Sequence, residues 1–492
     1  MLQRGGPDID PLAYSADGRS FSFEAPLRLP LPVGSYVLLE DEDGRSYLGQ
    51  VLQKEIINRD GAQISLELDD DDDQAIDGGR VAGVSARVKL RYVQGTGDLL
   101  VRVDGKKMSG TRPTDVFRVT EIAGEQSPAT MRPKGFGRHT FLCGQSGSGK
   151  TFALGVLLEQ LLMETELRLL VIDPNGDFSR LGEVQTNAAI NSSRANPYGR
   201  TELADVRRRY KEAASRVQLL GARVEHGADP LRIRFSDLGP EAQGAVLKLD
   251  PLADREEFSA YWRFIETLLG TRYSLADVRT FSGGVLTEHA RQIALRIENL
   301  GVADWDLWAS ADEPSLVDTL DSDWRAFVVD ISDLAQAEEQ AVTVTTILEH
   351  LWRRREDRNP VLVAIDEAHT ACPAEPTSKL QEASAVHVVR IAGEGRKYGL
   401  HLLVATQRPA KIHPNVLSQC DNLVLMRMNS AADLAGIAET FSFAPESMLA
   451  QAPYFDQGET LLAGGIVNRP TVARFGGRLS PEGGGDVPAT WA

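Results

Sequence analysis

The 492-residue sequence has little cysteine and no long apolar run. Its three cysteines, Cys143, Cys372 and Cys420, are too few and too widely spaced to predict a disulfide framework or a zinc site. The apolar runs are far shorter than the roughly 20 residues that cross a bilayer. The first residues also lack the apolar core of an export signal. These absences predict a cytoplasmic protein with reduced thiols and no membrane association.

Positive charge is scarce as well. Lys and Arg number 53 against 70 Asp and Glu, which gives a formal net charge of −17. This balance argues against a protein whose whole surface coats nucleic acid, although a ring or channel can still present basic loops locally. Two arginine triplets, at 207–209 and 353–355, could contact phosphates in a salt-dependent way. A solvated helical face is the other interpretation of each triplet.

Short alternating apolar stretches, punctuated by Gly, Asp and Pro, predict an all-β domain over residues 1–130. Five strands are expected, which is enough for a small β-barrel. Five consecutive aspartates at 69–73 are interpreted as a solvated loop, because a calcium site would interleave other oxygen ligands and a glycine. The five expected strands lie at 36–39, 47–52, 64–68, 86–93 and 99–103.

The rest of the chain predicts an α/β core over residues 131–475. Strand and helix patterns alternate at 131–180 and again at 360–475, whereas helical patterns dominate about 185–325. A helical insertion within one α/β core explains this order best. The glycine-rich end, 476–492, predicts a disordered tail.

The segment 144–151 has the sequence of a phosphate-binding P-loop and lies between an apolar strand and a helical pattern, the context that this motif requires. Its glycines let the backbone turn tightly and aim successive N–H groups at phosphate oxygens, and the positive end of the helix adds to the attraction. Lys150 is expected to reach the β- and γ-phosphates, and Thr151 to offer its hydroxyl to Mg²⁺. The predicted nucleotide-binding residues of the loop are Gly144, Gln145, Ser146, Gly147, Ser148, Gly149, Lys150 and Thr151.

A second apolar strand, 360–365, ends in the carboxylates Asp366 and Glu367. Because open α/β folds bind ligands at the carboxyl ends of their strands, both acids are expected at the nucleotide. Asp366 is predicted to hold the Mg²⁺ shell through water, and Glu367 to polarise the attacking water as a general base. A third strand, 400–405, precedes Gln407, whose amide both donates and accepts hydrogen bonds and is predicted to sense the γ-phosphate.

Arginines near these motifs are candidates for stabilising transition-state charge. Arg396 lies in the segment 393–399, from which a guanidinium could reach a neighbouring subunit's nucleotide as an arginine finger. Arg390 is the reserve candidate, and Arg138, just before the P-loop strand, is a further one. An ordinary basic surface turn is the alternative interpretation of the 393–399 segment.

A third pair of acids, Asp173 and Asp177, follows the apolar run 169–172. Asp173 begins an Asp-Pro-Asn-Gly sequence that matches the DxxG of switch GTPases, but no guanine-specifying element follows downstream. The match is therefore interpreted as fortuitous. Both acids end another parallel strand and are expected to face the nucleotide or the next subunit.

In combination, these motifs resemble the HerA branch of the FtsK–HerA translocases. The resemblance is specific over about 130–475, and the all-β domain is similar to the HAS-barrel of this family by pattern alone. The segments that carry it are 144–151, 173–178, 363–369, 394–400, 405–409 and 415–422.

The resemblance implies a RecA-like motor that forms hexameric rings around double-stranded DNA and hydrolyses ATP with Mg²⁺ between subunits. It matches Arg396 to the trans-acting arginine and Arg138 to another arginine of the intersubunit site. Motors of this family commonly work with a nuclease, either NurA-like in DNA end processing or another effector in antiviral defence. One departure is that Asn175 and Asp177 stand where the family usually has histidine and glutamate, which leaves the roles of both open.

Two other functions compete with a DNA motor. A secretion or conjugation motor would act on protein or single strands, and the lack of a membrane-spanning segment counts against it. A nucleotide-dependent assembly module would use ATP binding to hold a ring that activates an effector nuclease. An intact Glu367 counts against a purely binding role, and DNA-stimulated ATP hydrolysis would separate the motor from the module.

Overall fold

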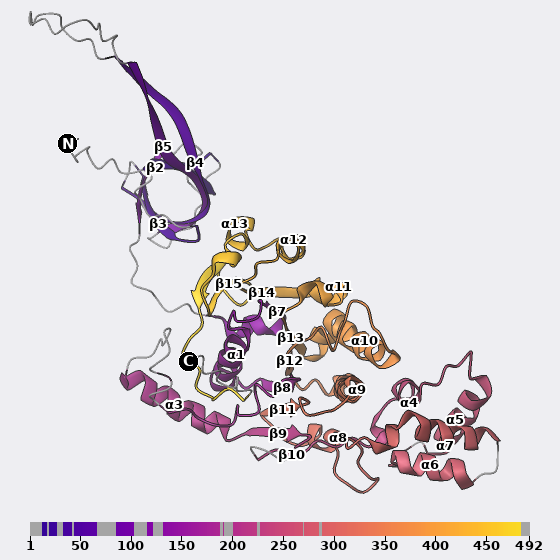
Figure 1. Cartoon of the computed structure of the whole chain (residues 1–492). Helices are drawn as coiled ribbons and strands as arrows, with labels where there is room; N and C mark the ends of the chain where they lie inside the picture. Colours follow the sequence, from indigo (N-terminus) through magenta and orange to yellow (C-terminus); the bar gives the residue numbers. More distant parts are fainter. Residues whose placement is uncertain are drawn as a thin grey trace, which may run out of the picture. The chain divides into compact units, whose positions relative to one another are not determined.

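The computed structural model divides the chain into two compact units, Met1–Ser127 and Pro128–Ala492 (Figure 1). Each unit has its own strands, so the two are described separately. The structure describes residues 12–16, 19–26, 33–41, 44–65, 85–102, 116–121, 131–186, 190, 200–223, 227–268, 270–284 and 288–483.

The first unit is a closed antiparallel barrel with the strand order β1-β2-β5-β4-β3-β6. Inward-facing side chains such as Phe21, Phe23 and Val37 are buried and form its core. Glycines on β5 make room for the rings, because a Cβ at Gly97 would lie 2.5 Å from the Phe21 ring. The strands are β1 (Leu12–Tyr14), β2 (Ser20–Pro26), β3 (Tyr36–Asp41), β4 (Ser46–Ser65), β5 (Ser85–Arg102) and β6 (Val116–Glu121).

The sequence predicts four short strands between residues 47 and 103, whereas the structure has two longer strands, β4 and β5, in this region. β4 contains the expected strand 47–52 and the start of 64–68, and β5 contains 86–93 and most of 99–103. The alternation of Phe21, Phe23 and Ala25 is the signal that could have predicted β2. The aspartates at 69–73 lie outside the described residues.

The second unit is built on a ten-stranded sheet with the order β10-β9-β11-β8-β12-β13-β7-β14-β15-β16. The first eight strands in this order are parallel, and β15 and β16 are antiparallel at one side. All carboxyl ends of the parallel strands therefore meet at one edge, here called the carboxyl edge, and their starts meet at the opposite amino edge. The strands are β7 (His139–Cys143), β8 (Arg168–Asp173), β9 (Val217–Gly221), β10 (Asp229–Pro230), β11 (Ala326–Asp330), β12 (Val361–Ile365), β13 (Leu400–Thr406), β14 (Cys420–Met426), β15 (Glu459–Gly464) and β16 (Thr471–Arg474).

Helices cover both faces of this sheet, which is why its central strands are apolar throughout. Figure 1 shows α1 and α3 on one side of the sheet and α9 and α10 on the other. Helices α5, α6 and α7 pack on one another as a separate group. The helices are α1 (Lys150–Glu164), α3 (Arg200–Ala214), α4 (Pro240–Val246), α5 (Arg255–Thr267), α6 (Leu275–Gly284), α7 (Glu288–Leu300), α8 (Leu316–Leu320), α9 (Ala337–Arg353), α10 (Lys379–Glu394), α11 (Pro414–Leu417), α12 (Ala431–Thr440) and α13 (Glu446–Leu449).

The region expected as a helical insertion, about 185–325, also contributes to the sheet. β9 pairs in parallel with β11, and β10 pairs with β9, so both extend the core sheet rather than interrupt it. Helices α4 to α8 follow β10 in the chain and precede β11.

The predicted disordered tail is wrong for residues 476–483. Arg478, Leu479 and Ser480 are buried, and the backbone N–H groups of Leu479 and Ser480 donate to the carboxylate of Glu159 on α1. The glycine-rich composition indicated disorder. It gave no sign of the buried partner, because Glu159 lies more than 300 positions earlier in the sequence. Residues 484–492 lie outside the described residues.

Candidate active site

The P-loop follows β7 at the carboxyl edge of the sheet and leads directly into α1. Gly147 and Gly149 adopt φ values of 73° and 93°, in the left-handed region that glycine enters without strain. Gly144 is tightly enclosed, since a Cβ there would lie 2.8 Å from Met426 Cβ. The loop is also tied to β14, because Gln145 N donates to the carbonyl of Arg427 at 2.9 Å. The local sequence thus fixes a backbone nest at the positive end of α1.

Lys150, Asp366 and Glu367 meet at this edge. Asp366 and Glu367 directly follow β12, which lies two strands away from β7 in the sheet. The Lys150 ammonium contacts Asp366 Oδ1 and lies 3.1 Å from Glu367 Oε1. Burial disfavours the charged ammonium, but the charges and hydrogen bonds of both carboxylates outweigh burial and raise the pKa of Lys150. The predicted P-loop residues (the Walker A motif) and the acids after β12 (the Walker B motif) therefore come together.

Glu367 is held in place by several neighbours. Gln407 Nε2 donates to Glu367 Oε1 at 2.9 Å, and His369 Nδ1 lies 3.2 Å from Glu367 Oε2. Burial alone would raise the pKa of this carboxyl, but the hydrogen bond from His369, the charge of Lys150 and further hydrogen bonds lower it to about 2. Glu367 also has φ +41°, a conformation that costs a non-glycine residue of the order of 1–3 kcal/mol and persists where the surroundings enforce it.

Two buried oxygens of the site make no hydrogen bond within the protein. They are Asp366 Oδ2 and Ser148 Oγ. Buried polar atoms are normally satisfied, so such orphans need a partner. A hydrated Mg²⁺ beside a triphosphate would satisfy Asp366 Oδ2, and Thr151, in the first turn of α1, could supply a further oxygen ligand. The donor set fits Mg²⁺, which keeps several waters and takes phosphate oxygens rather than a cage of protein ligands.

Asp173 has a structural role that the sequence did not predict. Its Oδ1 accepts hydrogen bonds from the backbone nitrogens of Asn175 and Asp177, both at 3.2 Å, and its Oδ2 accepts one from Phe178 at 2.7 Å. Burial is the main reason that its pKa rises to about 7, and nearby acids add to the effect. Asp173 therefore closes its own loop over the end of β8.

The structure does not bring Arg138 and Arg396 to the P-loop of the same chain. Arg138 directly precedes β7, and Arg396, in the 3₁₀ turn Gly395–Tyr398, precedes β13, so both lie at the amino edge. There they share one acceptor, because their Nη1 atoms lie 2.7 Å and 2.6 Å from Asp421 Oδ2. The reserve candidate Arg390 stacks over the Trp352 ring at 5.7 Å. These arginines could reach a nucleotide only in another subunit.

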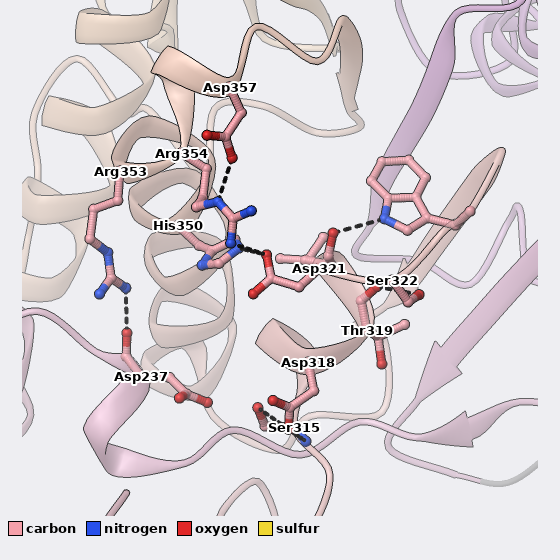
Figure 2. Close-up of polar contacts among 12 residues, drawn as sticks. Asp237, Ser315, Asp318, Thr319, Asp321, Ser322, His350, Arg353, Arg354 and Asp357 are labelled. Atoms are coloured by element: carbon pink, nitrogen blue, oxygen red, sulfur yellow. Dashed lines mark hydrogen bonds and ion pairs between the residues drawn. The ribbon is translucent and has the colours of Figure 1, made fainter. Parts of the chain in front are cut away.

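The two arginine triplets are largely occupied by contacts within the chain. Figure 2 shows Arg354 between Asp357 and Asp321, with N–O distances of 2.6 Å and 3.0 Å. Arg353 donates to the carbonyl of Asp237 at 2.7 Å, and His350 also contacts Asp321 (Figure 2). These contacts favour a structural role for 353–355.

The second triplet is similar. Arg208 pairs with Asp205 and Arg209 with Glu164, each at 2.6 Å. Arg207 donates to the carbonyl of Gln185 at 2.5 Å. The guanidinium groups of the triplet 207–209 thus bind neighbouring parts of the same unit.

Sequence reasoning assigned no role to three residues that the structure brings into contact with the predicted ones, namely His369, Asp421 and Arg478. His369 lies within the Walker B segment, so its place after Glu367 was a usable signal. Arg478 gave no such signal, because its partner Asp177 is remote in the chain. Asp421 stands in the segment 415–422, but no local pattern predicts its contacts with Arg138 and Arg396. The carboxylates around Lys150 do not form a closed metal-binding cage. Among the described residues, no group of three or more His, Cys, Asp or Glu side chains could hold a metal ion.

The fold and the site define a P-loop ATPase, in which the loop lysine meets the acids that follow a parallel strand two positions away in the sheet. Residues 117–354 match the family model described as Helicase HerA, central domain. Over this segment the chain is similar to the HerA-type helicases. Among the described residues, no helix is both long enough and apolar enough to cross a membrane.

Two relatives align over most of the chain. The DNA double-strand break repair helicase HerA of Sulfurisphaera tokodaii is 24% identical over 382 residues, which cover 74% of this chain and 70% of the relative. The protein of the same name from Pyrococcus furiosus is 22% identical over 394 residues, which cover 69% of this chain and 65% of the relative.

Solved structures match more distantly. VirB4 of Thermoanaerobacter pseudethanolicus has a TM-score of 0.42 at 15% identity, covering 68% of this chain and 88% of that one. The bacterial conjugative coupling protein TrwB, in its monoclinic form, has a TM-score of 0.44 at 14% identity, covering 72% and 90%. Likenesses of this size carry no functional argument.

Proposed function

We propose that this ATPase is a double-stranded DNA translocase or helicase of HerA type. The observation that carries the proposal is the cluster of Lys150, Asp366, Glu367 and Gln407 at the carboxyl edge, which has the parts needed for ATP hydrolysis. The relatives described as DNA double-strand break repair helicases support DNA as the substrate. In this proposal the first unit is a HAS-type barrel and the second a RecA-like motor.

Within the site, Lys150 exchanges the two carboxylates for β- and γ-phosphate oxygens when ATP binds. Thr151 and Asp366 would hold Mg²⁺, which would neutralise phosphate charge. The departure of Lys150 removes one cause of the low pKa of Glu367, so this carboxylate becomes a better base for the attacking water. Gln407, already bonded to Glu367, relays the presence of the γ-phosphate to β13 and the segment that follows it.

We also propose a role for the arginines at the amino edge of the sheet. Arg396 and Arg138 act on the nucleotide of the next subunit of a ring, which we propose to be a hexamer. A nuclease, NurA-like or another effector, is the proposed partner in DNA end processing or antiviral defence. Hydrolysis would then drive rigid-body changes that move the DNA.

The test is ATP hydrolysis with and without linear duplex DNA, measured for the wild type and for Lys150→Ala and Glu367→Gln. Two exposed residues of α10 give matched controls, Lys379→Ala and Glu382→Gln. We expect DNA to stimulate the wild type and both controls, and both site variants to lose hydrolysis. Phosphate contacts predict that the stimulation falls steeply as salt rises.

Each outcome decides between the candidate functions. Stimulation that is lost in both site variants supports the duplex motor. Hydrolysis that DNA leaves unchanged overturns it and favours an ATP-dependent ring that activates an effector. Hydrolysis that survives Lys150→Ala would mean that this P-loop is not the active site.

A further inference from the structure

The last described residues of the chain lie against the nucleotide-binding half of the sheet. The segment Arg478–Gly483, here called the C-terminal strap, packs on α1 and on the loop that follows β8. Glu159 of α1 is fully buried and accepts hydrogen bonds from Leu479 N and Ser480 N, each at 2.7 Å. The strap is therefore anchored on the helix that begins at Lys150.

Arg478 is the residue of the strap that reaches toward the active site. Its side chain is fully buried, and its Nε lies 3.9 Å from Glu159 Oε1. It packs so closely on α1 that a Cβ at Gly155 would lie 2.7 Å from the guanidinium carbon. Burying a guanidinium is costly unless it is paired and hydrogen-bonded, and here Glu159 and Glu482 supply the charge, with Glu482 Oε1 3.0 Å from Arg478 Nη1.

The Arg478 guanidinium also holds the loop after β8. Arg478 Nη2 donates to the backbone carbonyl of Asp177 at 3.3 Å, and Gly483 N donates to the same carbonyl at 3.0 Å. On the other side, the Asp177 nitrogen donates to Asp173 Oδ1 at 3.2 Å. The backbone of Asp177 is thus fixed from both sides, by the end of β8 and by the strap.

The loop of Asp177 lies at the same edge of the sheet as the acids that follow β12. β8 is the direct neighbour of β12, and Asp366 N donates to the carbonyl of Ile172 at 3.1 Å. The charges of Asp366 and Lys150 both act on Asp177. Its pKa rises to about 6, mainly because of burial and then because of Asp366, while Lys150 opposes the rise.

We propose that Asp177 is a further carboxylate of the ATP-hydrolysing site and that Arg478, through the C-terminal strap, is the positioning residue that holds the loop of Asp177 at the carboxyl edge. The inference rests on the proposed hydrolysis of ATP at the P-loop, but on neither DNA nor a ring. Arg478 contacts no reacting group, so it acts on hydrolysis only through the loop of Asp177.

The test is a double-mutant cycle on basal ATP hydrolysis in the full chain. Asp177→Asn removes the carboxylate, and Arg478→Gln removes the guanidinium. Because misplacing a group by about 1 Å can cost on the order of 100-fold, we expect each variant to lower kcat by about 10-fold to 100-fold and to leave KM for ATP within about twofold. In the Asp177→Asn background, Arg478→Gln should lower kcat by less than about twofold, because residues that act through each other are not additive.

Further variants separate positioning from folding. Arg478→Gln leaves Glu159 without its cation, so the pair Glu159→Gln with Arg478→Gln, which removes both charges, is measured as well. A chain that ends after Gly483 keeps the strap and serves as the control. Hydrogen exchange gives a readout independent of activity. We expect faster exchange at the Asp177 and Phe178 amides in the Arg478 variants, with α9 unchanged.

Three results would overturn the proposal. One is an Asp177→Asn protein with the kcat of the wild type. Another is that Arg478→Gln lowers kcat by the same factor in the wild type and in the Asp177→Asn background. The last is unchanged exchange at 177–178. Loss of hydrolysis in Lys150→Ala shows separately that the P-loop is the active site, so failure of this inference and failure of the proposed function give different results.

Discussion

At the scale of single residues, the active site is a buried cluster of opposite charges. Lys150 carries the cation, and Asp366 and Glu367 carry the anions. Removing one partner of such a cluster leaves a buried charge without compensation, which costs more than the pair contributes. The same contacts therefore govern both the chemistry and the stability of the second unit.

A stability prediction follows for Lys150→Ala. We expect it to destabilise the second unit by about 3–5 kcal/mol, the range found when one partner of a buried pair is removed. Adding Asp366→Asn to the same chain should recover part of the loss, because one of the two stranded carboxylates becomes neutral. Denaturant unfolding of the single and double variants measures both effects, and a double variant that is less stable than Lys150→Ala would contradict the argument.

A pH prediction follows for Gln407→Ala. The pKa of Glu367 is lowered from an ordinary value of 4.5 to about 2, partly by the Gln407 amide. A carboxyl with a depressed pKa contributes stability that is fully present above 4.5 and is lost as the pH falls toward 2. Without the Gln407 amide the pKa of Glu367 rises, so the contribution of the Glu367 carboxylate to stability becomes smaller.

We therefore expect Gln407→Ala to have a lower Tm than the wild type at pH 7, and the difference to narrow as the pH falls below 4.5. Thermal unfolding between pH 7 and pH 3 measures it. A difference that stays constant over this range would assign the effect of Gln407 to packing instead of to the charge of Glu367.

At the scale of elements, glycines in two helices give a matched comparison. Alanine usually stabilises an exposed helix interior by about 0.5–1 kcal/mol relative to glycine. A Cβ at Gly436 in α12 would enter open space, with no atom within 4 Å, whereas at Gly155 in α1 a Cβ would lie 2.7 Å from the Arg478 guanidinium. The two positions should therefore respond in opposite directions.

We expect Gly436→Ala to raise the stability of the second unit by about 0.5–1 kcal/mol, as helix propensity predicts. Gly155→Ala should lower it, because the strap must move off α1. Equilibrium unfolding of both variants is the measurement. Stabilisation by Gly155→Ala would show that the strap is held loosely, against the contacts between Arg478 and α1.

The elements also show which features the sequence could predict. The P-loop and the end of β12 are local motifs, so their residues, such as Lys150 and Asp366, could be identified from neighbouring letters in the chain. The alternation in β2 was a usable signal as well. The burial of Arg478 could not be predicted, because its glycine-rich surroundings indicate a tail and its partner Glu159 stands 319 positions earlier. The place of Arg396 at the amino edge required the strand order, which no local pattern contains.

At the scale of the whole molecule, the residues that we propose for ATP hydrolysis lie at opposite edges of one sheet. The carboxyl edge has the P-loop, Asp366 and Glu367, and the amino edge has Arg138 and Arg396 on Asp421. One chain cannot bring the two edges together, because they are opposite ends of the same strands. A heterologous ring, in which the amino edge of one subunit faces the carboxyl edge of the next, would do so.

Mixing two inactive variants tests this arrangement. Arg396→Ala keeps the P-loop but lacks the arginine, and we expect it to lose about 10³-fold or more of hydrolysis, as for other trans-acting arginines. Lys150→Ala lacks a working P-loop but keeps Arg396. In rings that mix both variants at random, about a quarter of the interfaces pair an intact P-loop with an intact arginine, so activity should reappear at up to about that fraction of the wild type.

The matched control replaces Lys150→Ala by the double variant Lys150→Ala, Arg396→Ala, which offers neither half of the site. Co-expression with two affinity tags and sequential purification isolates the mixed assemblies, and their ATP hydrolysis is compared. Because the control differs only in the guanidinium at 396, recovery in the first mixture alone assigns that group to the neighbouring nucleotide. Verified mixed assemblies that stay inactive, or that recover equally with the control, would mean that Arg396 and Asp421 only hold the amino edge together.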